Sequence, residues 1–377
     1  MRKEHLLLII MIISLLTGCW DFRQIDNTYI VTGIAIEKDP TSENLEVSVK
    51  IPIPSPNLNS SMAYTKKASI ISRKGNTMFN AIDKMEKEMK KELYLGHLQM
   101  VIISEDVARE KIYNILDTLS RNAHLKRSVY IVMSKIRPKE VLAARTDLDI
   151  SPITDLANMF EINKTNEFIP TTLDEFTSSI SGKTSDGMLP IIEMNNEIIT
   201  ASGMAIFKGG KYIGEINGEE IRVLSLLLYP EFTSEYYTVK GLGYNKDPDD
   251  LLTIQTKTGS GKIKVTLKDK QIEALLHIKL TGRIAEHTDN HPSMSDEETY
   301  MFAAKQLKRL LQSNLESLIH NSKGYNADIM EIGKYVKAKY PDYWNTIDWQ
   351  ETYKQVKFIP KIEVEIKSGT VTMINVS

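Results

Sequence analysis

The sequence predicts a mixed α/β (α+β) fold of two to three domains, each with a mixed or antiparallel sheet packed with helices, after a cleaved lipoprotein signal. Three observations predict this architecture. Runs rich in β-branched apolar residues alternate with segments of helical periodicity. The chain has 377 residues, 42% of them hydrophobic, which is enough for more than one core. The N-terminus has the charge pattern of an export signal.

The first nineteen residues are typical of a bacterial lipoprotein signal. Arg2 and Lys3 precede an apolar run at residues 6–16, and the four residues ending at Cys19 resemble a lipobox. At about 1.5 Å per residue, a helix of that length is shorter than the ~30 Å hydrocarbon core of a membrane. We therefore expect residues 1–18 to be cleaved and Cys19, the only cysteine, to carry the lipid, including palmitate. The alternative is an ordinary secretory signal followed by a chance cysteine.

Strands and helices alternate through the next part of the chain. One helix is predicted because Ile82, Met85 and Met89 recur at helical spacing, with charged residues on the opposite face. On that face, Asp83 with Lys87 and Glu86 with Lys90 have the spacing of i, i+4 ion pairs. The predicted elements are strands at 29–36, 45–53 and 68–72, a loop at 52–61, a helix at 76–93, a strand at 98–103, a helix at 107–119, a strand at 128–133, a helix opening near 138, and helices at 153–160 and 173–180.

The second half of the chain begins with a hairpin. Gly209 and Gly210 separate two apolar runs, as expected for a tight turn between paired strands. The further predicted elements are strands at 203–207 and 212–215, a helix at 219–228, an antiparallel meander at 251–256, 263–267 and 272–280, a long helix after a capping box at 295–298, and a hairpin of 361–366 with 371–376.

The change of pattern near residues 185–200 predicts a domain boundary. We expect an N-terminal domain at 19–195, with a possible small middle subdomain near 150–200, and a C-terminal domain at 196–377. After loss of residues 1–18 the net charge is −3, which argues against nucleic acid as a partner.

The glycine, histidine and aspartate motifs of this chain do not have the spacing of known sites. The segment 259–262 (Gly-Ser-Gly-Lys) lacks the Walker pattern, because Thr256 and Ile263 stand at two required positions, and it is interpreted as a turn between strands. His287 and His291 lack the helix and glutamate of a zinc protease. His97 is interpreted as a structural histidine. The acids Asp247, Asp249, Asp250 and Asp289 lack EF-hand spacing. The sequence therefore predicts no catalytic residue, no metal site and no cofactor.

Several segments together resemble one family along nearly the whole mature chain. The start at Cys19-Trp20-Asp21 with residues 29–38, and the segment 94–105, are similar to the C subunits of spore germinant receptors, the Ger(x)C lipoproteins. In the second half, the matching positions are 205–208, 212–215, 325–333, Tyr340, Pro341, Trp344 and Trp349. Residues 330–332 (Met-Glu-Ile) depart from the Phe-Gly-like core that the family has there.

The resemblance implies a non-catalytic assembly and signalling subunit. It implies a lipid-anchored protein on the outer face of the spore inner membrane that acts with an A subunit and a polytopic B subunit in germination. The resemblance does not decide whether this subunit itself binds a germinant. A solute-binding lipoprotein of a transporter is the alternative, and it would need two doubly wound lobes around a cleft. A cell-wall or lipid hydrolase is a third hypothesis, for which the sequence offers no nucleophile elbow or zinc signature.

Overall fold

A computed structural model describes residue 5 and residues 27–53, 68–110, 112–144, 152–162, 167–195, 198–229, 234–240, 251–288 and 296–367. Apart from residue 5, the predicted signal peptide lies outside the described residues, as do Cys19 and most of the predicted loop at 52–61. The predicted strand at 371–376 is also outside them.

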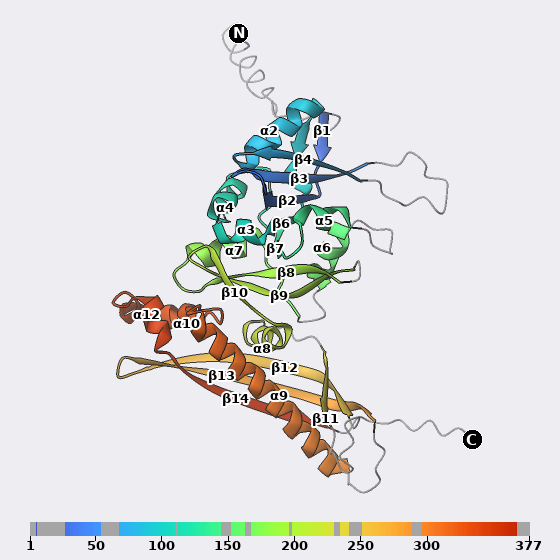
Figure 1. The fold of residues 1–377 in the computed structure, drawn as a ribbon. Coiled ribbons are helices and arrows are strands. Elements are labelled where there is room, and N and C mark those ends of the chain that lie inside the picture. Colours follow the sequence, from blue (N-terminus) through green and yellow to red (C-terminus); the bar gives the residue numbers. More distant parts are fainter. Residues whose placement is uncertain are drawn as a thin grey trace, which may run out of the picture.

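Eight strands form the larger of the two main sheets (Figure 1). The central strands β8, β7, β6 and β2 run parallel, and antiparallel strands flank them on both sides. The mixed sheet predicted from the sequence is thus confirmed. Its spatial order is β10 (Lys211–Ile216), β9 (Ile198–Lys208), β8 (Gly187–Asn195), β7 (Tyr130–Ser134), β6 (Met100–Ser104), β2 (Gly33–Lys38), β3 (Leu45–Pro52) and β4 (Ala68–Gly75).

The predicted strand at 29–36 is divided in two. Its first part, β1 (Thr28–Ile30), pairs with β5 (Glu92–Tyr94) in a separate small sheet, and the rest belongs to β2. The predicted hairpin around Gly209 and Gly210 is confirmed, and both glycines have positive φ angles of 54° and 69°. These angles match a turn of the primed type, which glycine adopts without steric cost.

The central strands are buried on both faces because successive side chains point to opposite sides of a sheet. Val101 and Ile103 belong to one hydrophobic core, and Met100 and Ile102 belong to the other. The first core is covered by α2 (Met78–Met89), α3 (Glu105–Glu110), α4 (Ile112–Ser120) and α7 (Leu173–Ser181), and the second by α5 (Pro138–Ala143) and α6 (Pro152–Ile162).

The helix predicted at 76–93 forms as the shorter α2. Thr77 caps its first turn by accepting a hydrogen bond from Asn80, and Lys90, with a φ of 56°, ends it. The predicted ion pair of Asp83 with Lys87 is present at 2.7 Å. Glu86 instead accepts a hydrogen bond from the backbone N–H of Leu93 at 2.7 Å. The helix predicted at 107–119 corresponds to α3 and α4, which lie on either side of residue 111.

Four longer strands form the second main sheet. The predicted strands at 251–256 and 263–267 are one strand, β12 (Leu251–Lys268), which pairs antiparallel with β13 (Gln271–His287) and with β11 (Tyr236–Lys240). The prediction of three separate strands was therefore wrong, while the antiparallel pairing of 263–267 with 272–280 is confirmed. The segment 361–366 does not begin a hairpin within the described residues: it belongs to β14 (Lys357–Ile366), which runs parallel to β13.

The interpretation of residues 259–262 as a turn was wrong. These residues lie inside β12 and continue its pairing with β13, where Gly261 is opposite Ile278. A Cβ atom on Gly261 would lie 1.8 Å from the carbonyl oxygen of Leu226 in α8 (Gly218–Leu228). The glycine is required by the close approach of a helix to the strand, and not by a change of chain direction.

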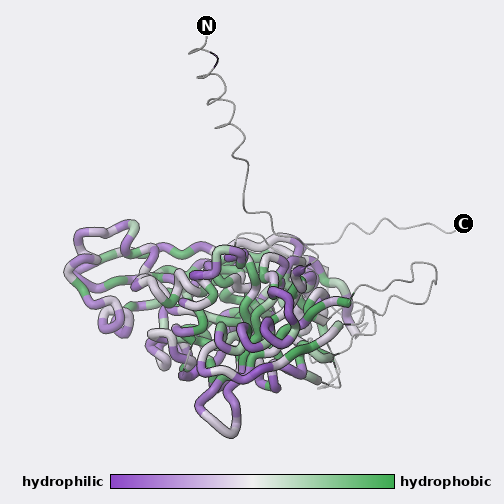
Figure 2. Tube along the Cα trace, turned by 90° about the horizontal axis from the view of Figure 1, so that it is seen from above, coloured by the Kyte–Doolittle hydropathy of each residue, from purple (hydrophilic) through white to green (hydrophobic). Residues whose placement is uncertain are grey.

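Helix α8 joins the two main sheets, between which it lies (Figure 1). Its residues Ile221 and Leu224 belong to the same core as Ile102 of the larger sheet and Leu276 of the smaller one. The long helix α9 (Asp296–Gly324) packs across the smaller sheet and contacts α8. Hydrophobic segments are concentrated inside the body, while hydrophilic segments occupy its outer turns (Figure 2).

The predicted boundary between residues 195 and 196 falls within the larger sheet, between the antiparallel neighbours β8 and β9. The division into domains at this place stays a prediction. Among the helices of the described chain, none is both long and apolar enough to cross a membrane.

Candidate functional site

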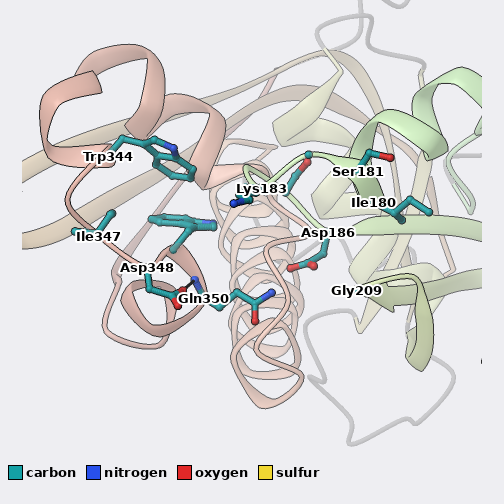
Figure 3. Close-up of a pocket in the computed structure, with 12 residues that line it drawn as sticks. Ile180, Ser181, Lys183, Asp186, Gly209, Trp344, Ile347, Asp348 and Gln350 are labelled. Atoms are coloured by element: carbon teal, nitrogen blue, oxygen red, sulfur yellow. Dashed lines mark hydrogen bonds between the residues drawn. The ribbon is translucent and has the colours of Figure 1, made fainter. Parts of the chain in front are cut away.

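A cavity of about 600 Å³ lies where the two halves of the chain meet. One wall is formed by residues 180–186, at the end of α7 and in the connection to β8, next to Gly209. The other wall is formed by residues 344–350, which link the short helices α11 (Pro341–Trp344) and α12 (Trp349–Lys354). Figure 3 shows Lys183 and Asp186 on one side of this space, and Trp344 and Asp348 on the other.

Aromatic and charged side chains share the walls of the cavity. The rings of Trp344 and Trp349 are 5.2 Å apart between centroids and tilted by 38°. The charged members are Lys183, Asp186 and Asp348, which give the lining one negative charge in excess when all three are ionised. Within the described residues, Lys183 has neither an ion pair nor a hydrogen bond. The cavity thus combines an apolar surface with charges, as many ligand sites do.

A fully buried carboxylate, Asp328, holds the wall behind the tryptophans. Its oxygens accept hydrogen bonds from the backbone N–H groups of Ile332 and Gly333, at 2.8 and 2.7 Å, at the start of α10 (Ile332–Lys339). It also accepts one from the indole Nε1 of Trp349 at 3.1 Å. Three donors satisfy this carboxylate, so the position of the Trp349 ring is fixed before any ligand arrives.

Asp186 connects the opposite wall to the same aspartate. Its carboxylate accepts a hydrogen bond from the backbone N–H of Asp328 at 2.8 Å, and its own N–H donates to the carbonyl of Asp328 at 3.1 Å. Burial raises the pKa of Asp186, and complete burial raises the pKa of Asp328 to about 7 although its three donors act in the opposite direction. The two walls are therefore joined by a pair of acids held in a dry environment.

Close packing around Gly333 and Trp349 also supports this junction. A Cβ atom on Gly333 would lie 2.5 Å from the carbonyl of Thr184 and 2.7 Å from the Nε1 of Trp349, so only glycine fits there. Tyr353 packs edge to face against Trp349 at 5.7 Å, and its hydroxyl forms a hydrogen bond with Ser322 of α9. Burial also raises the pKa of Tyr353 well above its ordinary value.

The second-half segments that carry the family resemblance meet at this junction. Lys208 of the segment 205–208 donates to the carbonyl of Asn326 at 2.7 Å, and the ring of Tyr325 lies against Gly214 of the segment 212–215. Glu331, where this chain departs from the family pattern, has a φ of 59°. Since glycine adopts such an angle more easily than other residues, a Phe-Gly-like core suits this backbone.

The other candidate residues of the sequence lie apart from the cavity. His97 is exposed at the end of a 3-10 turn (Leu95–His97) before β6, with its ring against Tyr94. His287 is the last residue of β13, and its expected companion His291 lies outside the described residues. The acids Asp247, Asp249, Asp250 and Asp289 are outside them too. Among the described residues there is no group of three or more metal-ligating side chains.

Sequence reasoning missed the polar residues of the cavity. Lys183 and Asp186 lie in a polar stretch beside the predicted domain boundary and match no site motif, and Asp348 and Gln350 follow no motif either. The signals that could have found the site were Trp344 and Trp349, since two tryptophans five positions apart are costly to leave exposed.

Two family models match this chain. The "Spore germination protein N-terminal domain" matches residues 21–194, and "Spore germination B3/GerAC like, C-terminal" matches residues 202–369. The cavity lies between residues of the first match and residues of the second.

Similar proteins extend over nearly the same length. Spore germination protein GerQC of Bacillus cereus is 23% identical, with 80% of this chain and 83% of the relative covered. The putative spore germination protein YfkR of Bacillus subtilis is 23% identical, with 94% of each chain covered. A crystal structure of the GerBC protein matches with a TM-score of 0.59 at 16% identity, covering 92% of this chain and 100% of that chain. This structural likeness shows a shared fold.

Proposed function

The chain belongs to the GerAC-like family of spore germination proteins, and on this premise we propose that it is the lipid-anchored C subunit of a nutrient germinant receptor. In this role Cys19 carries the lipid, and the folded part lies on the outer face of the spore inner membrane. There it acts without catalysis, as an assembly and signalling module beside an A and a B subunit. The match of both halves of the chain to the family, in order, carries this proposal.

The architecture also supports a role in assembly. One core continues from the larger sheet through α8 to the smaller sheet, so the two sheets are packed together and present their outer surfaces in a fixed arrangement. Tethering by lipid raises the local concentration of such a module near membrane partners. A transporter's solute-binding protein would need two doubly wound lobes, whereas the second main sheet here consists mostly of long antiparallel strands.

Replacement of the lipidated residue tests the proposal. In spores that lack redundant paralogues, we expect both deletion of the chain and the Cys19→Ala substitution to abolish nutrient-triggered germination. The physical reason is that the protein loses its anchor and thus its high local concentration at the membrane. The loss of optical density after addition of nutrients measures germination.

Two measurements complete the experiment. Membrane fractionation shows whether the Cys19→Ala chain is released, and pull-down of a tagged chain from solubilised spore membranes shows whether A and B subunits accompany it. Germination by a route that bypasses nutrient receptors is the control and stays normal. Normal nutrient-triggered germination in the deletion strain would rule the proposal out.

A further inference from the structure

The cavity at the junction has the properties of a preformed ligand site. Its volume of about 600 Å³ lies within the usual range for small-molecule sites, which tend to occur where domains meet. Its walls are fixed by the hydrogen bonds of Asp328 to Gly333 and Trp349, and by those of Asp186 to Asp328. The aromatic wall is therefore ordered before a ligand binds, and because fewer side chains have to be immobilised, the entropic cost of binding is lower.

The charges of the lining favour a cation over an anion. Lys183 and Asp186 lie on one side of the cavity and Asp348 on the other, so its lining has two carboxylates and one lysine (Figure 3). Burial penalises the charged form of Asp186, and the positive charge of Lys208 offsets only part of this penalty, so a second positive group in the cavity would favour the carboxylate further. One oxygen of Asp348 accepts hydrogen bonds from the N–H groups of Gln350 and Glu351 in the first turn of α12, and its other oxygen accepts none within the described chain.

The apolar part of the lining distinguishes an organic cation from a metal ion. Trp344, Trp349 and Ile347 contribute apolar surface, and tryptophan is the side chain with the strongest attraction for organic cations. A metal ion needs several converging oxygen or nitrogen ligands. The described part of the chain offers no group of three such side chains.

We propose that this cavity binds a small organic cation that carries an alkylated ammonium group. The methyl groups of the cation contact the tryptophan wall, and its charge is balanced by Asp186 and Asp348. Lys183 repels a ligand that has only a positive charge. In a zwitterionic ligand, which also has a carboxylate, Lys183 pairs with that carboxylate. This binding is a property of the purified chain and does not depend on the proposed role in germination.

Three probes separate charge from shape. The full chain in detergent micelles is titrated with choline, with its uncharged isostere 3,3-dimethyl-1-butanol, and with glycine betaine, and binding is followed by calorimetry and tryptophan fluorescence. We expect choline to bind about tenfold more tightly than the uncharged isostere, because a cation adds its attraction to aromatic rings and carboxylates. Equal affinities for these two probes, or no saturable binding of choline, would overturn the proposal.

Matched variants test the assignment of each residue. Asp348→Asn keeps a side chain that can cap α12 but removes a charge, so choline binding is expected to weaken while the fold is kept. Lys183→Gln is expected to strengthen choline binding and weaken glycine betaine binding. The control is Asp342→Asn, an exposed acid on α11 outside the cavity. If the control variant weakens choline binding as much as Asp348→Asn does, or if Lys183→Gln changes both affinities in the same direction, the site assignment is wrong.

Discussion

Asp328 shows how one residue organises a junction between distant segments. It is 1% exposed, yet its carboxylate accepts hydrogen bonds from Gly333 and from the indole of Trp349, and its backbone pairs with Asp186. A buried charged group without partners would cost several kcal/mol, which explains why so many donors converge on it. Removal of this carboxylate is therefore expected to disturb the cavity wall as well as stability.

The stability of the protein should depend on pH through Asp328. Burial raises its pKa in the folded protein to about 7, whereas an aspartate in an unfolded chain has a pKa of about 3.9. Between these values the folded protein holds a proton that the unfolded chain has released. The contribution of this group to the free energy of unfolding is therefore full below about pH 4 and is lost as the pH rises to about 7.

The Asp328→Asn variant has no titrating group at this position. We expect the stability of the native chain relative to this variant to fall by up to about 1.4 kcal/mol per pH unit across that window, and to stay constant above it. Urea unfolding at several pH values measures this difference. The exposed Asp342→Asn variant is the control, and its free energy of unfolding is expected to change with pH as that of the native chain does. A relative stability that does not change with pH would contradict the assignment.

At the scale of elements, β12 shows how a local pattern can be misinterpreted. Glycines and a lysine at 259–262 are typical of a turn, and the sequence contains nothing that marks the approach of α8. The strand continues through this segment because its backbone groups pair with β13, and because glycine lets the carbonyl of Leu226 come close. The prediction of strands on either side was correct, while the connection between them was decided by a helix more than thirty residues away in sequence.

Gly261→Ala tests this close approach. The added Cβ would meet the Leu226 carbonyl at 1.8 Å, so the helix or the strand has to move. We expect the free energy of unfolding to fall by about 1–3 kcal/mol, as in other overpacked cores. The matched control is Gly218→Ala at the start of α8, where a Cβ would meet no atom within 4 Å. If chemical denaturation shows that both substitutions lower the free energy of unfolding equally, the approach of the Leu226 carbonyl does not require glycine at position 261.

At the scale of the whole molecule, the two main sheets depend on each other. The larger sheet takes β9 and β10 from the second half of the chain, and α8 packs into the core that both sheets share. The family models divide the chain between residues 194 and 202. In the structure, β8 and β9, which lie on either side of residues 196 and 197, are antiparallel neighbours in one sheet.

We expect separate fragments of residues 19–195 and 196–377 to lack stable folds. Division there would expose the edge of β8 and remove strands from an eight-stranded sheet, leaving apolar surface without a partner. Circular dichroism and thermal unfolding of each fragment, beside the intact chain 19–377, measure this. Co-expression of the two fragments should restore cooperative unfolding. Cooperative unfolding of each fragment alone would instead establish independent domains at this boundary.

The sequence by itself determined the types of most elements, the mixed sheets and the family. These properties depend on local periodicity, as in α2, or on motifs that extend along the whole chain. Only the tertiary structure decided that β8 joins the parallel strands, that 259–262 continues β12, and that Lys183 and Asp186 face Trp344 across a cavity. The physical reason is that pairing and burial depend on residues far apart in sequence, and a local pattern does not record which partner approaches.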